Sequence, residues 1–251
     1  MCRGYDSAIT EVSCNLVCWE LVALSLDLRR TLRETLRRLT YIMLSFLDRA
    51  NAITMGALLL SCAVVFFAIQ QFYVLAVIAL IGAGLCDLFD GVIARRLNRS
   101  LPQKIFGQRL DSLVDACAFG MAPLVLCFKL GLSTMPDGLL LAFFVCCVVW
   151  RLAFFDTYGT EQNGDQLFYI GLPTTYVALV IPLVFQVALI DVEFMRILLR
   201  LSILGMAAMM VSPLRIPKPR ATGYACLLIT ALLVVSMLGL QLNRFQSALQ
   251  P

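Results

Sequence analysis

The fold is decided by the stretch CDLFDGVIARR, from Cys86 to Arg96, and by FGQRLDSLVDACAFG, from Phe106 to Gly120. Together these stretches place four aspartates in a chain that is otherwise suited to lipid. An ionisable side chain within a membrane helix costs at least about 2.5 kcal/mol on insertion scales. Four such carboxylates close together therefore require a cation, a substrate or a water-filled cavity, and we expect the chemistry of the protein here.

The composition is typical of a polytopic membrane protein, because 61% of the 251 residues are hydrophobic and only 14% are charged. Mean hydropathy is +0.88. Apolar stretches long enough to cross a hydrocarbon layer of about 30 Å lie near 52–70, 72–92, 110–130, 136–156, 170–190, 195–212 and 222–241. We predict an all-α membrane helix bundle, with about six core transmembrane helices and one more at the C-terminus.

Three segments are expected. Residues 1–50 form an N-terminal amphipathic segment, residues 51–220 a transmembrane core, and residues 221–251 an additional C-terminal helix and tail. In the first segment, arginines surround apolar residues that recur every three or four positions at Leu32, Leu36, Leu39, Met43 and Phe46. This pattern predicts a helix on the membrane surface, drawn to anionic headgroups. The alternative is a helix that packs on the bundle or on a neighbouring subunit.

The lysines and arginines predict the orientation, because cytoplasmic loops carry an excess of them. If the first span runs outward, only Lys129, Arg196, Arg200 and Arg244 lie outside, while the other 16 lie on the cytoplasmic side. All four aspartates then lie at cytoplasmic helix ends. We therefore expect an integral membrane protein with its active site facing the cytosol, in the cytoplasmic membrane if the organism is a prokaryote.

The aspartates fall on two helical faces. Asp87 and Asp90 are three residues apart, and Asp111 and Asp115 are four apart, so each pair shares one face. A short polar loop from Leu97 to Phe106 makes the two helices antiparallel neighbours, so the pairs can converge. A bare cluster of this kind would repel itself, whereas a divalent cation with oxygen ligands would stabilise it. We expect Mg²⁺ or Mn²⁺.

Small and basic residues accompany the first pair. Gly91 and Ala94 share its face and leave room for a ligand such as a metal-bound diphosphate, and Arg95 can contact a phosphate oxygen. Close helix packing and the positive-inside rule are the alternatives for single residues. The chain has no histidine, which excludes serine–histidine triads, histidine-bound zinc and haem, and leaves carboxylates as the acid or base groups.

These residues resemble the signature of the CDP-alcohol phosphatidyltransferases, D-x2-D-G-x2-A-R, a spacer, then G-x3-D-x3-D. Its eight fixed positions are matched by Asp87, Asp90, Gly91, Ala94, Arg95, Gly107, Asp111 and Asp115. The spacer between Arg95 and Gly107 has eleven residues, longer than the eight of the commonest form. It is similar to a variant found in some phosphatidylserine synthases.

Other stretches resemble the phosphatidylserine synthase branch. They are LDRANAIT (47–54), FGQRLDSLVDACAFGMAP (106–123), RLAFFD (151–156), GLPTT (171–175) and SPLRIPKP (212–219). The resemblance covers residues 47 to 220. Asp156 stands where that branch usually has asparagine, and Leu101, Pro102 and Gln103 stand where the long-spacer variant is usually acidic.

The resemblance implies transfer of a phosphatidyl group from CDP-diacylglycerol to the hydroxyl of an alcohol, most simply L-serine, with release of CMP. It implies a homodimer and two divalent ions held by Asp87, Asp90, Asp111 and Asp115, with Asp115 also the general base. Gly91, Ala94, Arg95, Gly107, Asn51 and Thr54 would contact CDP-diacylglycerol, although Asn51 could instead cap a helix. Arg151 is our hypothesis for the serine carboxylate.

Two alternatives remain at this point. The same centre could use glycerol 3-phosphate, an inositol phosphate or choline as acceptor, because basic side chains at the cytoplasmic ends could hold a phosphate. The aspartates could instead belong to a cation transporter or a metal-binding membrane scaffold. Membrane lipids are expected neighbours, and nucleic acid is not an expected partner, since the arginines follow the membrane surface.

Overall fold

The computed structural model describes residues 33–37, 40–41, 46–159, 161–163, 166–217 and 221–240. The chain divides into two compact units, Met1–Leu47 and Asp48–Pro251. In the first unit, residues 33–37 and 40–41 are helical with exposed side chains, and Phe46 lies in a turn. The other apolar positions of the predicted surface helix, Leu32, Leu39 and Met43, lie outside the described residues.

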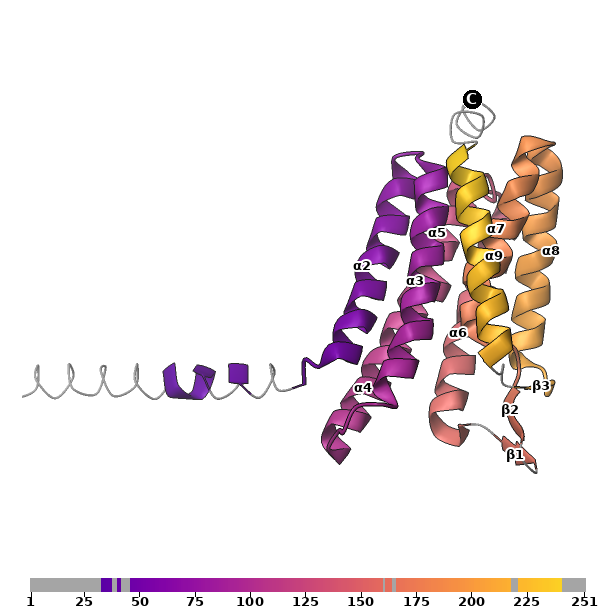
Figure 1. Ribbon diagram of the computed structural model, residues 1–251. Coiled ribbons are helices and arrows are strands. Elements are labelled where there is room, and N and C mark those ends of the chain that lie inside the picture. Colours follow the sequence, from indigo (N-terminus) through magenta and orange to yellow (C-terminus); the bar gives the residue numbers. More distant parts are fainter. Residues whose placement is uncertain are drawn as a thin grey trace, which may run out of the picture. The chain divides into compact units, whose positions relative to one another are not determined.

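The second unit is a bundle of helices (Figure 1). Its elements are α2 (Arg49–Ile69), α3 (Tyr73–Ala94), α4 (Leu101–Asp115), a π-helical turn (Ala116–Met121), α5 (Ala122–Lys129), α6 (Met135–Tyr158), α7 (Val177–Phe185), α8 (Val192–Val211) and α9 (Ala221–Leu240). Short 3-10 helices, Thr174–Tyr176 and Gln186–Leu189, flank α7.

Five of these segments are long and apolar enough to cross a membrane: α2, α3, the continuous stretch Leu101–Lys129, α6 and α8. Two shorter apolar helices, Thr174–Leu189 and Leu228–Leu240, accompany them in the described part of the chain. Large apolar side chains such as Leu59, Leu139 and Trp150 are exposed on the outside of the bundle, as expected for contact with lipid. The chain is a multi-pass membrane protein, and the predicted all-α membrane bundle is confirmed.

Two predicted boundaries are wrong. The third span begins at Leu101 rather than near 110, because Gln103 Oε1 accepts a hydrogen bond from the Ser100 N–H and Pro102 occupies the first helical turn. The last six of the ten residues of the predicted polar loop are therefore helix. The fifth helical segment begins at Thr174 rather than near 170, because Gly171 turns the chain with a φ of 76°.

A small antiparallel sheet was not predicted. It consists of β1 (Glu161–Asn163), β2 (Gln166–Ile170) and β3 (Arg215–Pro217), in the order β1-β2-β3. The register pairs Tyr169 with Ile216. The sheet thus joins the segment after α6 to the segment after α8, at the end of the bundle where α6 ends (Figure 1).

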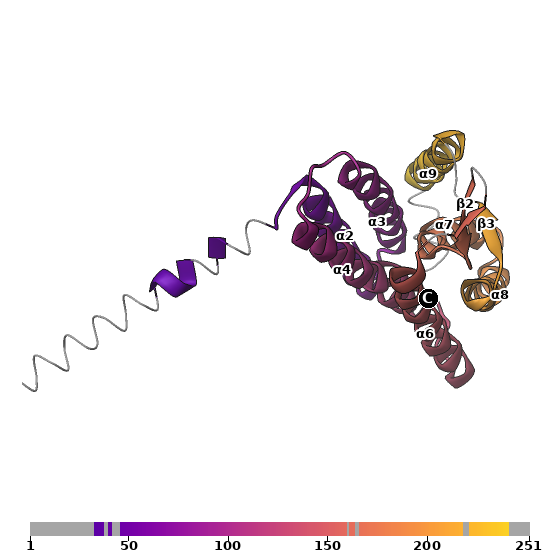
Figure 2. The same ribbon diagram turned by 90° about the horizontal axis from the view of Figure 1, so that it is seen from below.

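The core lies along α3, whose residues Ala76, Val77, Leu80 and Ala83 are fully or almost fully buried. Gly84 follows on the same helix, and a Cβ added there would lie 2.6 Å from the Cβ of Ala178. Because α3 and α7 approach this closely, the next turn of α3 faces the start of α7. Figure 2 shows the helices from the end that carries the sheet, with α3, α4, α6 and α7 as neighbours around one region.

Candidate active site

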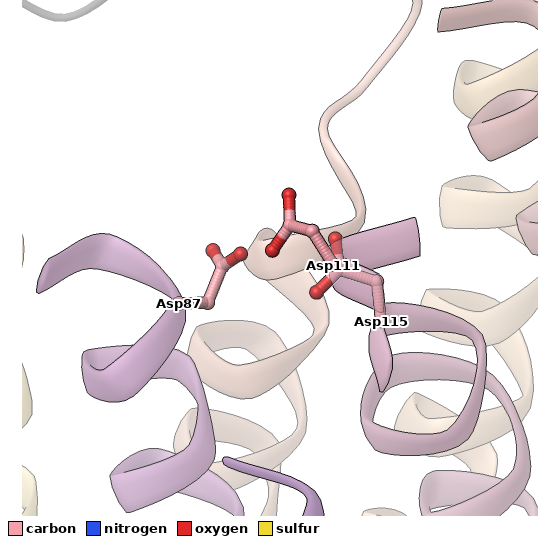
Figure 3. A group of neighbouring side chains, drawn as sticks. All are labelled: Asp87, Asp111 and Asp115. Carbon is pink, nitrogen blue, oxygen red and sulfur yellow. The ribbon is translucent and has the colours of Figure 1, made fainter. Parts of the chain in front are cut away.

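Three aspartates from two helices converge at this end of the bundle (Figure 3). Asp87 lies near the end of α3, while Asp111 and Asp115 lie on the last turn of α4. Each offers one carboxylate oxygen, and these three oxygens all lie within 4.8 Å of one another. The predicted meeting of the two helical faces is thus present for these three residues. A π-helical turn, a feature common at functional sites, follows directly after Asp115.

Salt bridges to the cluster are missing from the described part of the chain. Among the described residues, no lysine or arginine forms an ion pair with Asp87, Asp111 or Asp115. One neutral donor is present, since Thr175 Oγ1 donates a hydrogen bond to Asp87 Oδ2 at 2.7 Å. Three oxygen ligands so close together, without a cation from the protein, fit a hard divalent ion such as Mg²⁺ or Mn²⁺.

Asp90 is placed differently from the other three. It is buried, and its Oδ2 accepts a hydrogen bond from Thr54 Oγ1 at 2.6 Å. Of the four predicted metal ligands, it is the one outside the group of converging oxygens. Thr54, predicted to face the nucleotide, therefore also orients this carboxylate.

Two cavities meet at the aspartates. The first, of about 380 Å³, is lined by Asp87, Asp115, Arg151 and Asp156 among others. The second, of about 440 Å³, is lined by the start of α2, the end of α3, the connecting segment that contains Arg99, and α4. Residues that line both cavities are Asp90, Gly91, Arg95, Gln108 and Asp111. Two reactants can therefore bind on either side of one carboxylate cluster.

The small residues of the signature have different surroundings. A Cβ added to Gly91 would meet nothing within 4 Å, and this residue lines both cavities. Ala94 lines the second cavity. Arg95 is exposed, and its Nε donates to the carbonyl of Gly91 at 2.9 Å. Gly107 is instead packed, because a Cβ there would lie 2.9 Å from Arg99 Nη1 and 3.0 Å from Asn51 Oδ1.

The far side of the first cavity carries groups of both charges. Arg151 is only 4% exposed, its Cζ lies 5.0 Å from the centre of the Phe155 ring, and its Nε has no hydrogen-bond partner. Asp156, five residues further along α6, accepts from Ser112 Oγ, which lies 2.8 Å from both carboxylate oxygens. A buried guanidinium with an unused donor is suited to an anionic ligand.

The family model for CDP-alcohol phosphatidyltransferases matches residues 47–203. The chain belongs to the CDP-alcohol phosphatidyltransferase family. The resemblance noted on the signature residues is thereby confirmed. All eight signature residues line at least one of the two cavities, with Asp87 and Asp115 in the first only and Ala94 and Gly107 in the second only.

Curated relatives are named CDP-diacylglycerol-serine O-phosphatidyltransferase. The protein from Saccharomyces cerevisiae is 39% identical over 111 residues, which are 41% of this chain and 39% of the relative. The one from Mycobacterium leprae is 39% identical over 103 residues, 39% of this chain and 33% of the relative. The one from Bacillus subtilis is 32% identical over 133 residues, 52% of this chain and 68% of the relative. The match thus spans about a third to two fifths of the first two relatives.

Some site residues differ from the predictions for this family or were missed. Asn51 is not the cap of α2, because Asp48 Oδ1 accepts from the N–H groups of Ala50 and Asn51. Asn51 lines the second cavity. Ser112 and Thr175 were missed, although both lie within the quoted stretches RLDSLVD and GLPTT. Their hydroxyls become recognisable only when their carboxylate partners on other helices are known.

Proposed function

We propose that this protein transfers the phosphatidyl group of CDP-diacylglycerol to the hydroxyl of L-serine, giving phosphatidylserine and CMP. The proposal is carried by the convergence of three carboxylates where two cavities meet, with no salt bridge to any of them in the described residues. The family and the names of its relatives support it.

Mg²⁺ or Mn²⁺ would be held by Asp87, Asp111 and Asp115, with Asp90 beside them. The resemblance to the family implies two such ions. Bound there, the metal would offset the negative charge of the diphosphate, which is the main electrostatic demand of phosphoryl transfer. The donor set fits, because all the groups are carboxylates at close range.

The second cavity suits the nucleotide side of CDP-diacylglycerol. Arg95 and Lys104 supply positive charge, and Asn51, Thr54, Gly91, Ala94 and Gly107 form the remaining wall predicted for it. Basic side chains beside a phosphate-sized space are the expected complement of a diphosphate. The two acyl chains would lie toward the membrane lipids.

Asp115 is the proposed general base. It is buried at the boundary of the first cavity and lies within reach of an acceptor held there. It would take the proton of the serine hydroxyl while that oxygen bonds to the phosphorus of the phosphatidyl group and the bond from this phosphorus to the CMP oxygen breaks.

The acceptor assignment depends on the two charges of the first cavity. Arg151 would bind the serine carboxylate, and Asp156 would accept from its ammonium group. Both groups lie on α6, and among the described residues Arg151 Nε has no hydrogen-bond partner. A phosphorylated acceptor would meet the additional negative charge of Asp156, and choline has no carboxylate for Arg151.

We also propose that this end of the bundle faces the cytosol and that the protein is a homodimer. The positive charges support the orientation, because Arg95, Arg99, Lys104 and Arg109 lie near the aspartate end. At the other end, Lys129 ends α5, and Arg196 and Arg200 lie near the start of α8, where they contact Leu130 and Asp137. Cysteine accessibility in intact vesicles would test the orientation, and the mass of the purified protein in detergent would test the dimer.

The decisive experiment is CMP release by the purified full chain in detergent with CDP-diacylglycerol and Mn²⁺ or Mg²⁺. L-serine is compared with glycerol 3-phosphate, inositol phosphate and choline, and Asp115→Asn is the inactive control. We expect release that requires serine and is lost in the variant. Release with another acceptor alone overturns the serine assignment, and release with none overturns the enzyme proposal in favour of a transporter or scaffold.

Arg151→Lys tests the acceptor site. We expect a higher KM for serine with an unchanged KM for CDP-diacylglycerol, because lysine cannot reproduce the planar fork of donors. Arg109→Lys is the matched control, since Arg109 is exposed and lines neither cavity. An unchanged serine KM in Arg151→Lys would remove this residue from the site.

A further inference from the structure

Arg99 is a long cation buried in a connecting segment. It lies between the end of α3 at Ala94 and the start of α4 at Leu101, within the eleven-residue spacer and outside the eight signature positions. Its side chain is only 9% exposed. Burying a guanidinium is costly unless its donors are used, so its contacts must explain its position.

Those contacts join the spacer to the first turn of α2. Arg99 Nη2 lies 2.6 Å from Asp48 Oδ1 and 3.1 Å from Asn51 Oδ1. The same oxygen of Asp48 caps α2, accepting from two backbone N–H groups at 3.0 Å each. Burial acts to raise the pKa of Asp48, but the hydrogen bond from Arg99 and those from the backbone outweigh it and hold the pKa below its usual value of 3.8.

Gly107 on α4 completes this arrangement. A Cβ at this position would lie 2.9 Å from Arg99 Nη1 and 3.0 Å from Asn51 Oδ1, so only glycine leaves space for both side chains as they lie. The spacer, α2 and α4 therefore meet at Arg99.

The groups that Arg99 holds line the second cavity. Asn51 turns its Oδ1 toward Arg99, which fixes the direction of its amide. Thr54, one turn further along α2, donates to Asp90 Oδ2 at 2.6 Å, and Asp90 lines both cavities. The orientation of α2 thus sets the positions of one amide and one hydroxyl at the cavity wall, and this hydroxyl donates to a carboxylate of α3.

We propose that Arg99 is a positioning residue for the nucleotide side of the reaction, which holds Asn51 and the first turn of α2 in place through Asp48 and Asn51. This inference rests on the proposed function, because that function places the nucleotide in the second cavity. Arg99 itself also lines the second cavity, but the role proposed here runs through its neighbours and not through contact with the reacting atoms. The longer spacer thereby contributes a group that the signature does not contain.

The test compares Arg99→Met, Arg99→Lys and the matched control Arg96→Met in the full-length protein. Arg96 lies in the same connecting segment, is exposed and lines neither cavity. We expect Arg99→Met to raise the KM for CDP-diacylglycerol about tenfold, with less than a twofold change in the KM for serine. Arg99→Lys should fall between, since one ammonium group cannot reproduce the geometry of the guanidinium. Arg96→Met should match the wild type.

Two further readouts separate positioning from simple stabilisation. In an Asn51→Ala background, Arg99→Met should have a much smaller effect on that KM, because the amide it positions is already absent. CMP should raise the Tm of the wild type and of Arg96→Met, but not that of Arg99→Met. The inference is overturned if both KM values rise equally or if the effects of Arg99→Met and Asn51→Ala are fully additive. It is also overturned if Tm falls while the KM values and the CMP protection stay normal.

The failure of this inference can be told apart from that of the proposed function. CMP protection of the wild type, lost in Arg99→Met, together with no serine-dependent turnover would overturn the acceptor assignment and support the role of Arg99. Serine-dependent turnover without any KM change in Arg99→Met would support the proposed function and overturn the role of Arg99.

Discussion

Asp115 at the end of α4 and Asp137 near the start of α6 are both buried carboxylates, yet the protein surrounds them in opposite ways. Asp137 accepts hydrogen bonds from Arg200 Nε at 2.7 Å and Nη2 at 3.0 Å. Thr134 Oγ1 donates a third at 2.7 Å. Asp115 shares its site with two further aspartates, and no lysine or arginine that the structure describes forms a salt bridge with it.

The two sites lie at opposite ends of the bundle. Asp137 precedes Arg151 of the first cavity by fourteen residues on α6, or about 21 Å of helix. At Asp137 the protein itself satisfies the charge, and this pair connects α6 to α8. At Asp115 the charge is left for a ligand to satisfy. The comparison indicates that one carboxylate serves stability and the other serves binding and catalysis.

Asp115→Asn should have the largest effect on activity. We expect CMP release to fall by about 10³-fold, in the range for loss of a general base, and more if a metal ligand is lost with it. The Tm of the metal-free protein should stay the same or rise, because one of three mutually repelling charges has gone. A large fall in metal-free Tm would show that Asp115 resembles Asp137 after all.

The second largest effect is expected from metal removal, which should affect the aspartate cluster and leave the Asp137 site unchanged. With EDTA we expect activity to be abolished and Tm to fall, and Mn²⁺ should restore both, since an ion that binds only the folded state stabilises it. In Asp111→Asn the response of Tm to Mn²⁺ should be much weaker, whereas Asp137→Asn should respond like the wild type. A metal response that persists in Asp111→Asn would place the ion elsewhere.

Asp137→Asn should mainly lower stability. Losing the partner of Arg200 should cost about 1–3 kcal/mol, toward the lower end because the Arg200 side chain is 35% exposed. CMP release per folded molecule should remain near the wild-type value. Thermal unfolding and activity measured on the same preparation check this, and lost activity at an unchanged Tm would contradict it.

Two glycines on α3 allow a comparison between a packed position and an open one, and we expect smaller effects from their substitution than from the changes above. Gly84→Ala should cost about 1–3 kcal/mol of stability, because its Cβ would lie 2.6 Å from that of Ala178. Gly91→Ala should leave Tm unchanged, since its Cβ would meet nothing, and should raise the KM for CDP-diacylglycerol. Equal Tm values for both variants would show that α3 and α7 can separate without cost.

Local features of the sequence were enough to predict much of this protein. The spacing of Asp111 and Asp115 places both on one helical face wherever that helix lies. Apolar length predicts the long helices, because a chain in lipid must satisfy its backbone hydrogen bonds internally. The start of α4 was misplaced because a polar first turn, capped through Gln103, has no apolar signal.

The sequence by itself determined the membrane class, the helical bundle, the family signature and the pair of helices that carry the aspartates. Only the tertiary structure decided which groups these aspartates meet: Thr175 with Asp87, Ser112 with Asp156, and Arg99 with Asp48 and Asn51. It also decided that three carboxylates converge while Asp90 pairs with Thr54. Periodicity specifies the face of a single helix, whereas contacts between residues 36 to 88 positions apart depend on how the helices pack.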